Sequence, residues 1–83
     1  MEEQGTLDKV ELTLDCRGLL CPTPVLRLSG AVKTMKVGGI VEVVTSDPGA
    51  KQDIPEWSLR NKNELLRMEE EAGVLKFYIR KTA

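Results

Sequence analysis

The sequence predicts an α/β protein, a two-layer sandwich in which a mixed four-stranded sheet carries two helices on one face. Two observations lead to this prediction. The periodicity of apolar residues gives the element order β-α-β-α-β-β. The first crossover is long enough to return a parallel strand, and because such crossovers are right-handed, both helices are expected on the same side of the sheet.

The first strand is predicted at residues 9–15, where KVELTLD alternates strictly between polar and apolar side chains. Gly18 ends this extended run. From Val25 the apolar residues recur at the spacing of one helical face, which predicts an amphipathic helix of about 12 residues. The VGG triplet at 37–39 ends that helix, because glycine accepts the left-handed conformation common at helix C-termini.

The second strand is predicted at residues 40–45, where a nearly continuous β-branched run indicates an interior position. Asp47 is the expected cap of a helical start after it. Pro55 is expected to forbid an unbroken helix and to make Asp53 a second cap, so the second helix is predicted to be short, over residues 53–62.

The last third of the chain reads as a hairpin, with strands at 64–70 and 74–81 around a turn at 71–73. Alternation in its second strand places three large apolar side chains on one face, namely Leu75, Phe77 and Ile79. Trp57 is expected to pack on the apolar face of the second helix, and Tyr78 to lie on the outward register of the last strand.

The length and composition of the chain limit the partners and the location that we expect for it. With 83 residues the chain is expected to form a single domain, residues 1–83, with 1–7 as a flexible N-terminal arm. The 12 basic and 13 acidic residues argue against a direct nucleic-acid partner. No apolar stretch approaches the roughly 20 residues that span a bilayer, so no membrane partner is expected. The acidic N-terminus and the two cysteines favour a reducing, cytoplasmic location.

The C-P-T-P stretch at 21–24 combines a cysteine with a helix start. Thr23 as N-cap with Pro24 in the first helical position is one local solution, and Cys21 itself as the cap is the alternative. Either arrangement puts the Cys21 sulfur near the positive end of the helix dipole. We therefore expect the pKa of Cys21 to be lowered, although the chain has no histidine.

The absence of histidine removes several chemistries for Cys21. Papain-like acyl transfer lacks its general base. Cys16 and Cys21 alone, at a C-x4-C spacing, make a structural metal site improbable, and Pro24 replaces the second cysteine of a thioredoxin-type C-x-x-C motif. No metal and no cofactor is therefore predicted. Thiol exchange remains, in which a persulfide sulfur is taken up on Cys21 and passed to another thiol.

Cys16 is interpreted differently, because the strand alternation places it inward as a small apolar residue. A second interpretation makes Cys16 a resolving thiol that forms a disulfide with Cys21. That role requires the two Cα atoms to lie within about 7 Å of each other.

The segments LDCRGLLCPTPVLRL, TSDPGAKQDIPEW and FYIRK together resemble the TusA/SirA family of small sulfur-carrier proteins. The resemblance runs from about Leu14 to Lys81. The most specific part is the C-P-x-P box with its upstream D-x-x-G-L-x-C. Members of that family fold as a β-α-β-α-β-β two-layer sandwich, in agreement with the pattern of this sequence.

The resemblance implies that Cys21 carries a persulfide received from a cysteine desulfurase or a rhodanese and relays it to an acceptor protein. The pathway served would be tRNA 2-thiolation, molybdenum-cofactor synthesis or sulfur oxidation. The chain would then be a sulfurtransferase-type carrier rather than a free-standing catalyst, and we expect a monomer. The residues expected to support the site are Pro22, Pro24, Arg17 and Gly18.

Two positions depart from the family pattern. Leu20 stands where many members carry a basic residue, which leaves Arg17 as the nearest substitute, and Cys16 stands where threonine or alanine is common. An alternative function is a non-catalytic regulatory or protein-interaction module. In that case Cys21 is incidental, and a basic helix face docks a partner through Arg27, Lys33 and Lys36.

Overall fold

The computed structural model describes residues 10–19 and 23–82, and the predicted arm at 1–7 lies outside them. The elements follow the predicted order β-α-β-α-β-β. They are β1 (Val10–Cys16), α2 (Thr23–Thr34), β2 (Ile40–Thr45), α3 (Ala50–Arg60), β3 (Glu64–Glu71) and β4 (Val74–Arg80).

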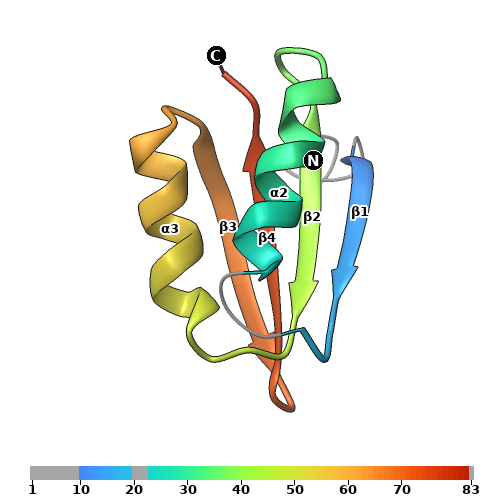
Figure 1. Cartoon of the computed structure of the whole chain (residues 1–83), viewed down its shortest axis with the longest axis vertical. Helices are drawn as coiled ribbons and strands as arrows, with labels where there is room; N and C mark the ends of the chain where they lie inside the picture. The colour runs from blue at the N-terminus through green and yellow to red at the C-terminus, as the bar shows by residue number, and fades with distance from the viewer. Residues whose placement is uncertain (1–9, 20–22, 83) are drawn as a thin grey trace, which may run out of the picture.

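The sheet has the strand order β1-β2-β4-β3. β1 and β2 are parallel, whereas β2 with β4 and β3 with β4 are antiparallel. Both helices lie on one face of this mixed sheet, which confirms the predicted fold class (Figure 1). Both helices also begin at the edge where β1 and β2 end, since each follows one of these strands through a short connection (Figure 1).

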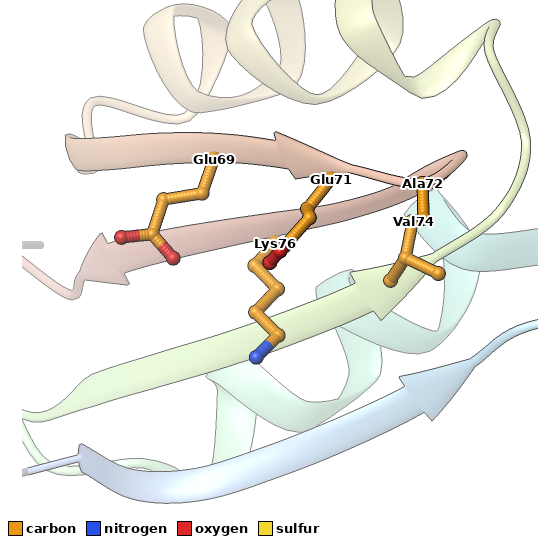
Figure 2. A pocket seen from close by; sticks show the side chains of 5 residues that line it. All are labelled: Glu69, Glu71, Ala72, Val74 and Lys76. Carbon is orange, nitrogen blue, oxygen red and sulfur yellow. The ribbon is translucent and has the colours of Figure 1, made fainter.

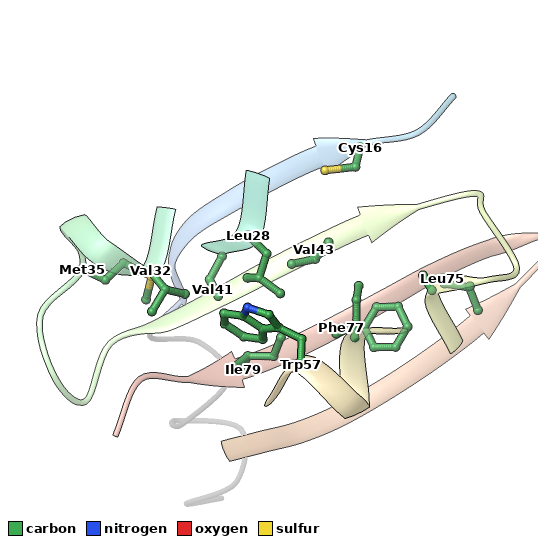
Figure 3. Close-up of a cluster of buried hydrophobic side chains, with 12 residues drawn as sticks. Cys16, Leu28, Val32, Met35, Val41, Val43, Trp57, Leu75, Phe77 and Ile79 are labelled. Atoms are coloured by element: carbon green, nitrogen blue, oxygen red, sulfur yellow. The ribbon is translucent and has the colours of Figure 1, made fainter. Parts of the chain in front are cut away.

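The core lies between the helices and the sheet (Figure 3). In β4 the inward residues are completely or nearly completely buried, and the alternate residues are more exposed, as the sequence period predicts. Trp57 is confirmed as a packing residue on the inner face of α3. The largest of its completely buried side chains are Phe77, Leu28, Ile54, Leu75, Ile79, Val41 and Val43.

α2 begins at Thr23, one residue before the first helical position that the Thr23 cap predicts. The residue that precedes this start belongs to 20–22 and is outside the described part of the chain. At the other end of α2, the Lys81 ammonium donates hydrogen bonds to the carbonyls of Val32, at 2.8 Å, and Met35, at 2.9 Å. A cation at this position satisfies carbonyls that have no partner within the helix and complements its dipole.

The prediction of a short helix over 53–62 is wrong, because α3 starts at Ala50 and continues through Pro55 to Arg60. Asp53 lies in its first turn rather than at a cap. Pro55 removes only one N–H donor from the helical ladder. The buried face of α3 compensates for that loss by packing on the sheet, and its members are Ala50, Ile54, Trp57 and Ser58.

The hairpin turn between β3 and β4 has two residues, Ala72 with φ 54° and Gly73 with φ 81°. Positive φ at both positions is the signature of a type I′ turn, whose twist matches that of paired strands. Glu71 therefore belongs to β3 and not to the predicted turn at 71–73. A register shift between Leu65 and Arg67 interrupts the regular alternation of β3.

The sheet face opposite the helices carries a hydrogen-bonded group around Glu42. Its carboxylate accepts hydrogen bonds from the Thr13 hydroxyl at 3.1 Å and from the Tyr78 hydroxyl at 2.9 Å. These contacts confirm the outward register of Tyr78. Burial, followed by the hydrogen bond to Glu42, raises the pKa of Tyr78 to about 12.

Tyr78 is the only tyrosine of the sequence, so its titration can be followed by tyrosinate absorbance. Because its folded pKa lies above the ordinary value, its contribution to stability is present below about pH 10 and is lost as the pH rises toward 12. Glu42→Gln is expected to lower the pKa of Tyr78. Glu56→Gln on α3 is the matched control, and an equal shift in both variants would contradict the assignment.

Candidate functional site

The candidate site lies at the sheet edge where the parallel strands β1 and β2 end and where both helices start (Figure 1). Ligands and reactive groups of α/β proteins gather at the carboxyl ends of parallel strands. In the sequence, residues 17–22 connect β1 to α2. Cys21 and Pro22 themselves fall on residues 20–22, outside the described part of the chain, so their roles stay predictions.

The residues on either side of this segment are anchored in the core. Leu19 is half-buried and packs against the central cluster. Pro24, the second residue of α2, is fully buried. Its buried ring is compatible with the predicted supporting role, since proline is well tolerated in the first turn of a helix.

Gly18 forms the turn that leads from β1 into the segment with Cys21. The Leu19 N–H donates to the Cys16 carbonyl at 3.2 Å, and Gly18 has φ +81°, the conformation of the third position of a type II turn. The Gly18 N–H donates to the Ser46 hydroxyl at 3.0 Å. The turn after β1 is thereby tied to the loop after β2.

Gly18→Ala is expected to destabilise the protein by roughly 1 to 2 kcal/mol, because a side chain is strained at positive φ. Gly30→Ala is the matched control. Both glycines have open space where a Cβ would stand, but Gly30 lies in α2 without positive φ, so alanine there is expected to stabilise the helix. Urea unfolding measures both effects, and the same sign for the two variants would contradict the argument.

Arg17, predicted to supply positive charge near Cys21, is bound to Asp15. Its Nε and one terminal nitrogen each donate to a different carboxylate oxygen of Asp15, both at 2.9 Å. These bonds lower the pKa of Asp15 to about 2 and raise that of Arg17. The pair is exposed and electrically neutral as a unit, so the positive field that Arg17 alone would project is reduced.

Cys16 ends β1 with no exposed surface, as its inward register predicts. Burial raises the pKa of the Cys16 thiol, and the charge of Arg27 opposes this only in part. A buried thiol with a raised pKa is a poor nucleophile at neutral pH. The resolving role of Cys16 stays a prediction, and its thiol is free in the structure.

The sequence interpretation missed Ser46, whose hydroxyl holds Gly18. The polar SDPG loop gave a signal, but it was assigned to helix capping alone. The hydroxyl of Thr45, the last residue of β2, accepts the Asp47 N–H at 3.1 Å, and the Asp47 carboxylate accepts the Gly49 N–H at 3.0 Å. These local hydrogen bonds hold the loop in which Ser46 accepts the Gly18 N–H.

A hollow of about 280 Å³ opens near the hairpin turn, lined by Glu69, Glu71, Ala72, Val74 and Lys76 (Figure 2). It lies on the sheet face away from the helices. Among residues 10–19 and 23–82, no group of three or more histidine, cysteine, aspartate or glutamate side chains could hold a metal ion. In the same residues, no helix is both long and apolar enough to cross a membrane.

Comparison with known proteins finds several that are similar to this chain in sequence. The chain is similar to the sulfur carrier protein TusA of Pseudomonas entomophila, with 41% identity over 73 residues that cover 88% of this chain and 91% of that protein. It is also similar to the putative sulfur carrier protein YrkI of Bacillus subtilis, with 40% identity over 73 residues, or 88% of this chain and 97% of that protein.

The fold is similar to the crystal structure of a SirA-like protein from Desulfitobacterium hafniense. The TM-score is 0.75 at 25% sequence identity, covering 87% of this chain and 99% of the other. The family model described as sulfurtransferase TusA matches residues 12–81, nearly the whole described chain. Sequence motifs, architecture and relatives agree, and the chain belongs to the TusA family.

Proposed function

We propose that this protein is a sulfur carrier that holds a sulfane sulfur as a persulfide on Cys21. The observation that carries the proposal is the TusA family match over residues 12–81, which includes the C-P-T-P box. The names of the similar proteins from Pseudomonas entomophila and Bacillus subtilis, both sulfur carriers, support it.

The proposed step is a thiol exchange with no net oxidation. The Cys21 thiolate attacks the terminal sulfur of a persulfide on the donor protein. The sulfur–sulfur bond of the donor breaks, its cysteine leaves as a thiolate, and Cys21 keeps the sulfur in a new sulfur–sulfur bond. The same exchange in the opposite sense transfers the sulfur to an acceptor, so no general base within this chain is required.

The start of α2 supports the ionised form of Cys21 that this step needs. α2 begins at Thr23, two residues after Cys21 in the sequence, and a helix N-terminus stabilises a nearby thiolate. Arg17 is already paired with Asp15. We therefore assign the main lowering of the Cys21 pKa to the helix start rather than to Arg17.

The proposed donor is a cysteine desulfurase or a rhodanese, and the proposed acceptor is a downstream protein of tRNA 2-thiolation, molybdenum-cofactor synthesis or sulfur oxidation. We propose that the carrier works as a monomer in the cytoplasm, where thiols stay reduced. The lowered pKa that we propose for Cys21 is tested by the pH dependence of its alkylation rate, and an ordinary or raised thiol pKa would contradict it.

The proposal is tested by incubating the protein with a cysteine desulfurase and free cysteine, followed by mass spectrometry. Arg17 lies between the two cysteines, so trypsin places Cys16 in the peptide 10–17 and Cys21 in the peptide 18–27. We expect one added sulfur, in the second peptide. The absence of any adduct with several desulfurases and rhodaneses would instead favour the alternative of a regulatory or protein-interaction module.

A further inference from the structure

A second hollow, of about 170 Å³, lies between α2 and α3, away from the edge where β1 and β2 end. Its polar lining comes from four parts of the chain: Ser29 and Lys33 of α2, Trp57 of α3, Asn61 and Asn63 between α3 and β3, and Lys81 after β4. None of the side chains that line it is acidic. Two cations thus line a space that has no carboxylate: Lys81 is held by two carbonyls of α2, and Lys33 has no counter-ion among these residues.

Several side chains that line this hollow have N–H groups that are not used in hydrogen bonds among the described residues. Lys81 uses two of its three N–H groups on the carbonyls of Val32 and Met35. The Asn63 side-chain oxygen accepts the Thr82 N–H, which directs the amide nitrogen of Asn63 to other partners. Within residues 10–19 and 23–82, Lys33 forms no ion pair.

Trp57 provides an independent indication of a ligand. Trp57 is only 8% exposed. It is drawn within the cluster of buried side chains in Figure 3, and buried indole N–H groups usually find an acceptor. In the described residues, the Trp57 N–H has no hydrogen-bond acceptor. In the described residues, every completely buried polar side-chain atom has a hydrogen-bond partner. The Trp57 N–H has none, so it is not completely buried. The N–H therefore retains some solvent contact, and Trp57 is one of the residues that line the hollow.

We propose that this hollow binds one tetrahedral oxyanion of the phosphate or sulfate class. The donors approach from two helices and two connecting segments, so they suit four oxygens spread around a centre better than one planar carboxylate. The volume equals that of about five or six water molecules in the liquid, enough for one such anion with its contacts. The anion is either free or the terminal phosphate of a larger molecule.

The single tryptophan of the sequence makes the test direct, because the protein has one indole N–H signal in a ¹H–¹⁵N spectrum. Sodium phosphate is titrated against sodium chloride at equal ionic strength. We expect a saturable shift of the indole signal with phosphate, with a Kd on the order of 1 mM, and no saturable shift with chloride. O-phosphoserine in a parallel titration distinguishes the sources, since equal or tighter binding indicates the terminal phosphate of a larger molecule and weaker binding a free anion.

Matched variants separate this site from general attraction to positive charge. Lys33→Gln is expected to raise the Kd roughly tenfold, by removing one charge-assisted hydrogen bond. Lys36→Gln removes the same charge three residues later, outside the hollow, and should leave the Kd unchanged. A linear response to phosphate, or equal Kd values for the two variants, would overturn the proposal. The sulfur-loading reaction of Cys21 is measured separately, so either proposal can fail alone.

Discussion

Cys21→Ser is expected to abolish sulfur loading completely. A serine hydroxyl does not ionise near neutral pH and does not hold sulfur in a persulfide, so the exchange has no nucleophile and no product. The measurement is the mass of the intact chain after incubation with a cysteine desulfurase and cysteine. The loss should be all-or-none rather than partial, because the chain has only one other thiol, Cys16, and that side chain has no exposed surface.

Cys16→Ala is the matched control for that experiment. Because the Cys16 thiol is buried and burial raises its pKa, its removal should leave loading of Cys21 intact. The variant leaves a small cavity, so circular dichroism should first establish that it folds. Sulfur carried by Cys21→Ser, or loading lost in a folded Cys16→Ala, would show that the assignment of the two cysteines is wrong.

Phe77→Ala is expected to cause the largest loss of stability among single substitutions in the core. Phe77 heads the fully buried side chains by volume and lies in β4, opposite Val43 of β2 and Met68 of β3 (Figure 3). Such a truncation costs about 3 to 5 kcal/mol. A domain of 83 residues has a free energy of unfolding of roughly 4 to 12 kcal/mol, so a large part of the total would be lost.

Leu59→Ala is the control for the core, because Leu59 is 82% exposed on α3. Its free energy of unfolding should change by no more than about 0.5 kcal/mol. Urea denaturation followed by circular dichroism compares the two variants. Similar midpoints for Phe77→Ala and Leu59→Ala would mean that the packing around β4 contributes much less than its burial indicates.

The elements that the sequence predicted well are those whose burial follows a simple period. In β1 and β4, the alternation of apolar and polar residues predicts which side chains face the helices. In β2, the continuous apolar run predicts an interior strand. The bounds of β2 were confirmed without change. α3 starts earlier than predicted, because the packing of the whole helix face on the sheet outweighs the local cost of Pro55.

The candidate site was predictable only in part. Gly18 and the cysteines stand out by residue type and position. The hydrogen bond from Gly18 to Ser46 joins residues 28 positions apart, and it depends on β1 and β2 being adjacent and parallel. The pairing of Arg17 with Asp15 likewise follows from the turn geometry after β1 and not from a helical or strand period.

The strand order β1-β2-β4-β3 has a consequence for how the chain is synthesised. β4 is synthesised after the other three strands of this sheet, yet it lies between β2 and β3. Until it arrives, β2 has an open edge, and the helices lack the inner face formed by Leu75, Phe77 and Ile79. The sheet is therefore completed only once β4 has been synthesised, and a chain interrupted before β4 would expose an unpaired strand prone to aggregation.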